Sequence, residues 1–179
     1  GQIVSKIPMA VTTGRRLGVI LTENLLEKRL DSLREGQAGQ KLNTIELLNG
    51  LVAERNAAEK YGVMYRHKAI SQDILEQAFD ITLNNEENWQ VRLMMLNVLR
   101  KAGDKFEASD RFSEELQNLR WPVRLLSLYG LTRLSESYED DSEEIDEFQK
   151  VLNWVYQADE QPIVRHLAEI EGAKKVSTD

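Results

Sequence analysis

The apolar positions of the chain recur with helical spacing, and one pattern occurs twice. The segment from Asn88 to Leu99, NWQVRLMMLNVL, returns as the segment from Arg120 to Leu131, RWPVRLLSLYGL. In both copies a tryptophan stands near the start, Val-Arg begins two residues after it, and leucines recur every three or four positions. This period places the apolar side chains on one face of a helix. Because such a helix cannot bury its apolar stripe alone, the recurrence predicts stacked helices that share a continuous core.

Capping residues and helix breakers indicate further helices in the first half of the chain. A helix is expected over residues 22–35, followed by a loop over residues 37–40. Its expected buried residues are Leu25, Leu26, Leu30 and Leu33. Asn43, with Glu46 three residues later, predicts the start of a second helix. That helix is expected to end at Tyr61 and to bury Ile45, Leu48, Val52 and Ala53.

The second half of the chain alternates helices with short turns. Ser71 is expected to cap a helix that buries Ile74, Leu75, Ala78, Phe79 and Leu83. After the segment that begins at Trp89, further helices are expected over residues 106–119, 121–137, 143–158 and 162–172. Their expected buried residues include Phe106, Phe112, Leu116, Leu119, Ile145, Phe148, Leu152, Val155 and Tyr156.

These segments predict an all-α protein built from antiparallel helix pairs, with an extended arm at residues 1–20. One all-α domain is expected over residues 21–173, followed by a tail at residues 174–179. Within it, residues 21–69 would form a helical hairpin and residues 70–173 about three further helix pairs. No segment is expected to form a strand.

The Val-Arg signature resembles HEAT repeats, in which the second helix of each pair commonly opens with Pro or Asp and then Val-Arg. The resemblance covers about residues 70–173, and the matching positions are Val91-Arg92, Pro122-Val123-Arg124 and Pro162-Ile163-Val164-Arg165. It implies a short stack of helix pairs used as a binding surface for another protein. The repeated arginines are expected to cover the edges of the core and to bond to neighbouring loops or carboxylates.

Composition narrows the classes of function. A hydrophobic fraction of 41% with 30% charged residues is typical of a globular protein. No apolar run approaches the roughly 18 to 20 residues of a membrane-spanning helix, and no signal-peptide pattern is present. With no cysteine, the chain has no disulfide, thiol nucleophile or cysteine-bound metal. The net charge of -7 argues against general nucleic-acid binding.

The N-terminal hexapeptide GQIVSK fits an N-myristoylation signal, with Gly1 as the site of lipid attachment. The arm carries Lys6, Arg15 and Arg16 and no acid before residue 23, so these three cations are the expected membrane-proximal charges. The hexapeptide also resembles the starts of myristoylated peripheral membrane proteins, including retroviral-type matrix proteins, which are small and all-helical. Alternatively, Gly1 is the remnant of a cleaved tag.

Acidic residues concentrate in the segment between the last two expected helix pairs. The partner-binding candidates are Glu139, Asp140, Asp141, Glu143 and Glu144. Aligned as a calcium-binding loop from Asp140, the segment has Ile145 in place of the turn glycine and Val151 in place of the closing glutamate. The segment is therefore expected to be a solvated helix entry, with docking of a basic partner as its functional alternative.

Catalytic signatures are scarce. His67 and His166 have no second ligand at metal-binding spacing on the same helix face, and no phosphate-binding glycine loop or nucleophile elbow occurs. No metal or cofactor is therefore expected. Tyr61, Tyr65, Arg66 and His67 are the one cluster that an enzyme or lyase acting on a protein substrate would use.

The leading hypothesis is a non-enzymatic peripheral membrane scaffold, anchored by a myristoyl group and binding a protein partner of unknown identity through its helical surface. A matrix-like virion protein is its specific form. It would be cytoplasmic, on the cytoplasmic face of a membrane, and would not bind nucleic acid. The alternatives are a soluble HEAT-like adaptor and the repeat-fold enzyme.

Overall fold

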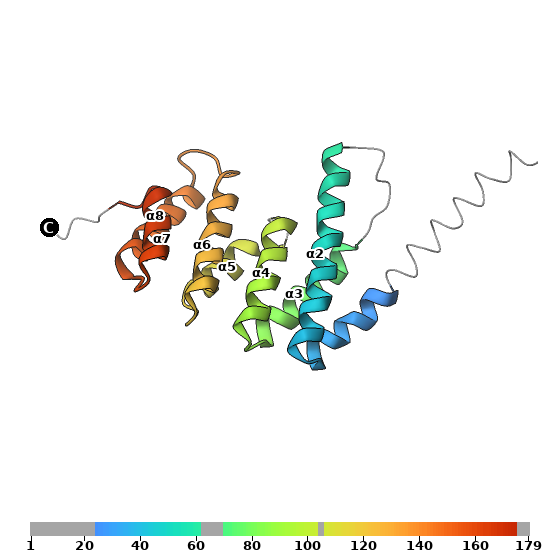
Figure 1. Ribbon diagram of the computed structural model, residues 1–179. Helices are drawn as coiled ribbons and strands as arrows, with labels where there is room; N and C mark the ends of the chain where they lie inside the picture. The colour runs from blue at the N-terminus through green and yellow to red at the C-terminus, as the bar shows by residue number, and fades with distance from the viewer. Residues whose placement is uncertain (1–23, 62–69, 104–105, 175–179) are drawn as a thin grey trace, which may run out of the picture. The chain divides into compact units, whose positions relative to one another are not determined.

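The computed structural model describes residues 24–61, 70–103 and 106–174 (Figure 1). These residues form helices and no strand, as the sequence predicts. A first helix covers residues 24–35. The others are α2 (Ala38–Tyr61), α3 (Gln72–Asn85), α4 (Trp89–Ala102), α5 (Ala108–Glu115), α6 (Trp121–Ser135), α7 (Glu143–Ala158) and α8 (Pro162–Ile170). The predicted arm, with Gly1, Lys6, Arg15 and Arg16, lies outside the described residues.

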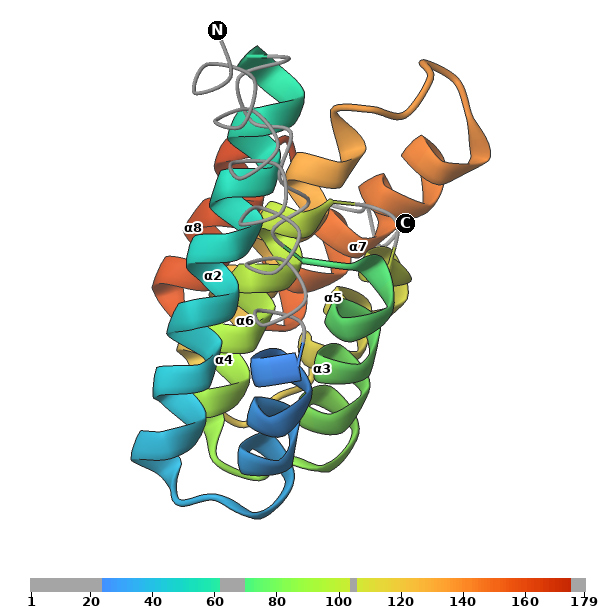
Figure 2. The ribbon, with the colours of Figure 1, turned by 90° about the vertical axis from the view of Figure 1, so that its right-hand side faces the viewer.

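The chain divides into two compact units, Gly1–Lys101 and Ala102–Asp179. The first unit contains the helix at residues 24–35 together with α2, α3 and α4, and the helix at residues 24–35 lies beside α2 and α3 (Figure 2). Its buried core is apolar and comes from every one of these helices: Leu26, Leu30, Leu33, Ile45, Leu48, Val52, Ile74, Leu75, Phe79, Val91, Met95 and Leu99. The burial of α3 follows the predicted periodicity along its whole length.

Hydrogen bonds between helices support the first unit. The hydroxyls of Ser32 and Thr44 lie 2.7 Å apart, which joins the helix at residues 24–35 to α2. The Asn56 amide donates to the carbonyl of Lys101 at 2.8 Å and joins α2 to the end of α4. Because Thr44 is fully buried, its hydroxyl needs such a partner.

The start of α2 corrects the prediction at residues 37–40. The helix begins at Ala38, five residues before the predicted cap Asn43, which is an exposed residue inside the helix. The Gln40 side chain accepts a hydrogen bond from the backbone N–H of Gln37 at 2.9 Å, and Lys41 N–H donates to the Gln37 carbonyl at 3.0 Å. These two bonds close the first turn, so the polar residues that look like a loop begin the helix instead.

Three predicted core residues are exposed. Leu25 is 52% exposed and Ala53 is also exposed, because each lies one residue, and therefore about 100°, from the buried stripe of its helix. Leu119 is 95% exposed because α5 ends at Glu115 and leaves it in the following turn.

In the second unit α6 packs against α5, α7 and α8. At the contact between α6 and α5, Gly130 lies against the ring of Phe112. A β-carbon at Gly130 would lie 2.6 Å from the ring atom Cζ, so this packing requires glycine. The helix α7 has the predicted bounds and begins after Ser142, whose hydroxyl accepts from Ile145 N–H at 3.3 Å.

Candidate functional site

The arginine of each Val-Arg signature bonds to the turn that precedes its own helix. In all three cases Nη1 donates to the backbone carbonyl six residues earlier. The bonds are Arg92 to Glu86 at 2.9 Å, Arg124 to Asn118 at 2.8 Å and Arg165 to Asp159 at 2.7 Å. We call this contact the arginine clamp. It agrees with the expectation that the repeated arginines bond to neighbouring loops.

The residue that accepts the arginine clamp also shapes the turn with its side chain. A side-chain oxygen of Glu86, Asn118 or Asp159 accepts from the backbone N–H two residues later, at 3.0, 2.9 and 2.9 Å respectively. The backbone carbonyl and the side chain of one residue therefore hold the turn from two sides. The same arrangement occurs before α4, α6 and α8, so the repeat seen in the sequence is also a repeat of atomic contacts.

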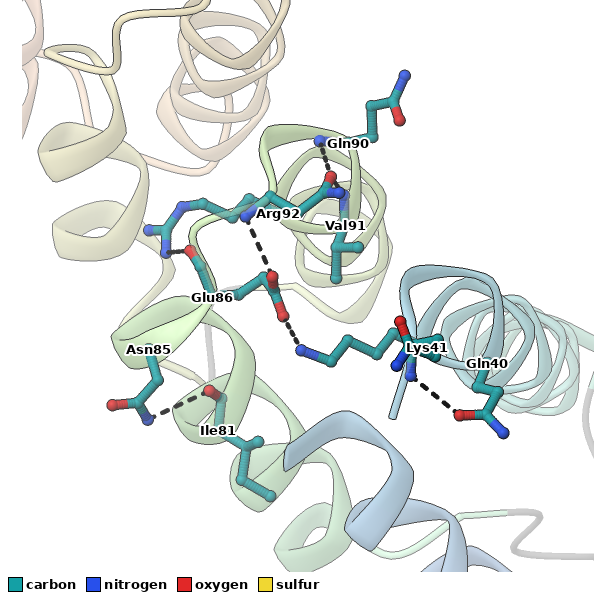
Figure 3. A network of polar contacts seen from close by, with 10 residues as sticks. Gln40, Lys41, Ile81, Asn85, Glu86, Gln90, Val91 and Arg92 are labelled. Atoms are coloured by element: carbon teal, nitrogen blue, oxygen red, sulfur yellow. Dashed lines mark hydrogen bonds and ion pairs between the residues drawn. The ribbon is translucent and has the colours of Figure 1, made fainter. Parts of the chain in front are cut away.

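Two of these turn residues are carboxylates that meet a cation from an earlier helix. Arg124 donates to Asp159 through Nε at 2.8 Å and Nη2 at 3.0 Å, and the side chains are only 15% and 6% exposed. In the first unit Lys41 of α2 donates to Glu86 (Figure 3). The two-pronged geometry of Arg124 and Asp159 fixes orientation as well as charge.

The environment of Glu86 favours its ionised form. Burial of its carboxylate opposes ionisation, but the hydrogen bonds from Lys41 and from Asn88 N–H and the positive charges of Lys41 and Arg92 outweigh burial. The pKa of Glu86 is therefore lowered from its ordinary value. At neutral pH the pair is charged and couples α2 to the turn before α4.

The second unit contains a hollow of about 380 Å³ between α5, α6 and α7. Its apolar lining consists of Leu131, Tyr138, Phe148 and Val151. Its polar lining consists of Ser109, Asp110, Ser113, Glu143, Glu144 and Glu147. We call this feature the acidic hollow. It combines an apolar surface with four carboxylates, which is a combination suited to binding rather than to the interior of a core.

The acidic hollow contains some of the predicted partner-binding residues. Glu143 and Glu144 line it, whereas Glu139, Asp140 and Asp141 are exposed in the connection before α7 and do not line it. Asp141 has a φ of 62°, the left-handed backbone of a tight turn.

Sequence reasoning missed the other two carboxylates of the hollow, Asp110 and Glu147. The spacing of Glu143, Glu147 and Val151 at four-residue intervals places them on one face of α7 and could have indicated Glu147. Asp110 belongs to α5, and no local pattern connects α5 to α7. Its place in the hollow follows only from the packing of both helices on α6.

The other chemical candidates remain apart. His166 lies 4.0 Å from Glu169, and both side chains are more than half exposed. Among residues 24–61, 70–103 and 106–174 no group of three His, Asp or Glu side chains could hold a metal ion. Tyr61 is 67% exposed, and its predicted companions Tyr65, Arg66 and His67 lie outside the described residues. No described helix is both long enough and apolar enough to cross a membrane.

Comparison with known proteins gives no relative, since no family model, curated protein or solved structure matches the chain. The interpretation of the arginine clamp and the acidic hollow therefore rests on their own residues.

Proposed function

We propose that the protein is a non-enzymatic scaffold of HEAT-like helix pairs that binds another protein on its helical surface. The observation that carries this proposal is the arginine clamp, repeated before α4, α6 and α8. Arrays of helix pairs with a repeated internal contact provide rigid extended surfaces, and binding is their usual use.

Exposed apolar side chains of the second unit favour the same function. Trp154 on α7 is 49% exposed, and Ile163 and Ile170 on α8 are 46% and 64% exposed. Ile163 and Ile170 are seven residues apart and therefore lie on the same face of α8. Large apolar side chains grouped on one helix face are costly in water and are typical of contact surfaces.

We also propose that this scaffold is anchored at a membrane through its N-terminus, and this part of the proposal rests on the sequence. Gly1 would carry a myristoyl group, and Lys6, Arg15 and Arg16 would add attraction to anionic lipid. A matrix-like or virion component is the specific form of this idea. A single acyl chain holds a protein only weakly at a membrane, so the basic residues are the necessary second signal.

Site-specific photo-crosslinking in the native cell tests the scaffold function. A photoreactive amino acid placed at Ile170 is expected to capture one defined protein, because that side chain lies on the proposed contact surface. The control places the same amino acid at Glu54, an exposed polar position on α2. Equal and unspecific capture at both positions would contradict the proposal.

Intact mass and membrane flotation test the anchor separately. Protein expressed in eukaryotic cells from its natural start is expected to gain the mass of one myristoyl group and to float with anionic vesicles. Replacing Gly1 with alanine should abolish both results, because the acyl transfer requires an N-terminal glycine. A free or acetylated N-terminus would leave a soluble adaptor, the alternative raised by the sequence.

A further inference from the structure

The lining of the acidic hollow exposes apolar surface that the fold does not use. Leu131 of α6 is buried, whereas Phe148 and Val151 of α7 are only half-buried and face the hollow. An aromatic ring and a branched side chain beside an open volume of about 380 Å³ offer contact area to a ligand. The volume is near the lower end of the range of about 300–1,000 Å³ usual for small-molecule sites, so it accommodates side chains of a partner and not a whole helix.

Carboxylates from two helices surround this apolar surface. Asp110 comes from α5, and Glu143, Glu144 and Glu147 come from α7. Three of them lie in the first turns of their helices, where negative charge is favoured. The preference for acids at helix starts explains the presence of each of these three carboxylates. It does not explain Glu147, and it does not explain why the starts of two helices line the same hollow.

Most of this negative charge is not neutralised within the described residues. Glu147 pairs with Lys150 at 3.3 Å, but both side chains are largely exposed, so the pair contributes little and a ligand cation can replace it. Asp110, Glu143 and Glu144 form no ion pair with any other described residue. The positive partial charge at each helix start, about half an elementary charge, is smaller than the sum of the carboxylates.

The described residues hold no group of acidic side chains close enough to bind a metal ion. Several carboxylates beside an apolar surface instead match several cations spread along a chain that also carries apolar side chains. A basic amphipathic helix has this chemistry, because its lysines flank one apolar stripe.

We propose that the acidic hollow binds a basic amphipathic helical segment of a partner protein. Apolar side chains of that segment contact Phe148 and Val151, and its lysines or arginines pair with Asp110, Glu144 and Glu147. The inference rests on the proposed scaffold function and gives that scaffold a partner class. The charge complementarity between the hollow and such a segment specifies the occupant.

Fluorescence anisotropy with three synthetic peptides of about 14 residues, some four helical turns, tests this proposal. The first peptide repeats lysine-leucine-leucine-lysine. The second replaces each lysine with glutamate, and the third replaces each leucine with serine. The full chain is expected to bind the first peptide and to bind the other two at least about tenfold more weakly, because the hollow requires both cations and apolar contacts. Binding of the first peptide should weaken as salt is added.

Two protein variants that lose the same number of charges locate the binding. The hollow variant combines Asp110→Asn, Glu144→Gln and Glu147→Gln. The control variant combines Glu139→Gln, Asp140→Asn and Asp141→Asn, which lie close by in sequence but do not line the hollow. We expect the hollow variant to lose about tenfold in affinity and the control variant to lose much less. Circular dichroism of both variants verifies that the helices are retained.

Several outcomes would overturn the proposal. They are equal losses in the two variants, equal binding of the leucine and serine peptides, or no binding of the lysine-leucine peptide up to about 1 mM. Nuclear magnetic resonance shifts that avoid Phe148 and Val151 would also overturn it. The scaffold function is tested independently, because crosslinking at Ile170 probes a surface that does not line the hollow. If Ile170 captures a partner but the hollow binds no peptide, only the present inference is rejected.

Discussion

At the scale of single residues, Gly130 shows how a missing side chain determines packing. A β-carbon there would meet three atoms of the Phe112 ring at 2.6 to 2.8 Å. Phe112 is fully buried, so the ring has little room to move. The predicted α6 segment contains this glycine without any pattern that indicates its purpose, since glycine inside a helix is normally a cost.

We predict that Gly130→Ala destabilises the protein, with an overpacking cost of about 1–3 kcal/mol. The better helix propensity of alanine recovers at most about 1 kcal/mol. Urea unfolding measures the difference. The matched control is Gly50→Ala on α2, where a new β-carbon would meet nothing within 4 Å. That variant should gain up to about 1 kcal/mol, and equal effects at both positions would contradict the packing explanation.

Glu86 allows a prediction on pH. Its lowered pKa means that the folded state binds the proton less tightly than the unfolded chain does. The stabilisation is therefore present above the unfolded pKa of about 4.3 and is lost as the pH falls through the folded pKa. We expect Glu86→Gln to cost about 1–3 kcal/mol at pH 7 and progressively less in acid, where the wild-type carboxylate is protonated as well. Urea unfolding of both proteins at neutral and acidic pH gives the two costs, and a cost independent of pH would refute the assignment.

At the scale of helices and turns, two parallel hydrogen bonds from Arg124 to the carboxylate of Asp159 join the start of α6 to the turn before α8. We call this pair of bonds the fork. A double-mutant cycle with Arg124→Ala and Asp159→Asn is expected to give a coupling energy of about 1–3 kcal/mol, because the pair is two-pronged and largely shielded from water. Asparagine retains a side-chain oxygen that can accept from Gln161 N–H, so the turn itself should persist.

The exposed pair of Arg133 on α6 and Glu136 just after it is the control for this cycle. Both side chains are more than half exposed, so their coupling should remain below about 1 kcal/mol. Arg124→Lys distinguishes charge from geometry, since lysine keeps the charge but cannot form two parallel bonds with a carboxylate. A coupling in the Arg124 cycle no larger than that of the control would show that the fork does not stabilise the contact between α6 and the turn before α8.

Helix boundaries were predictable where the stop and start signals are local. The bounds of α7 follow from Ser142 as cap and from the apolar period behind it, and Ser71 marks the start of α3 in the same way. The start of α2 was not predictable in this way. The Gln40 side chain accepts the hydrogen bond from the backbone N–H of Gln37, and glutamine at this position is not a recognised sequence signal for a helix start. The prediction that Leu119 is buried was wrong because its spacing continues the apolar period of the preceding residues, whereas the helix itself ends at Glu115.

The candidate site was predictable only in part, for a related reason. Val-Arg indicated arginines at the edges of the core, and the acidic run indicated Glu143 and Glu144. The acceptors of the arginine clamp are a glutamate, an asparagine and an aspartate, so no common letter marks that position in the sequence. Asp110 lines the acidic hollow because α5 and α7 both pack on α6. The periodicity of apolar residues within one helix does not predict which helices pack together.

At the scale of the whole molecule, each of the two compact units contains its own packed helices. In the second unit the contacts of α6 with α5, α7 and α8 are all internal to that unit. We therefore predict that residues 102–179, expressed alone, retain helical circular dichroism and unfold cooperatively in urea. Gly130→Ala in this fragment should lower the urea midpoint. A fragment that lacks a cooperative transition would show that its stability depends on residues 1–101.

The arginine clamp has a consequence for the order of folding events. It closes a span of only six residues, so it costs little chain entropy and can form as soon as its helix starts to nucleate. The fork between Arg124 and Asp159 joins residues 35 apart and has to wait until two helix pairs meet. We therefore expect the arginine clamp, the contact that accompanies the Val-Arg repeat, to form early in folding. We predict that the longer contacts form after the folding transition state, so that losing them mainly accelerates unfolding.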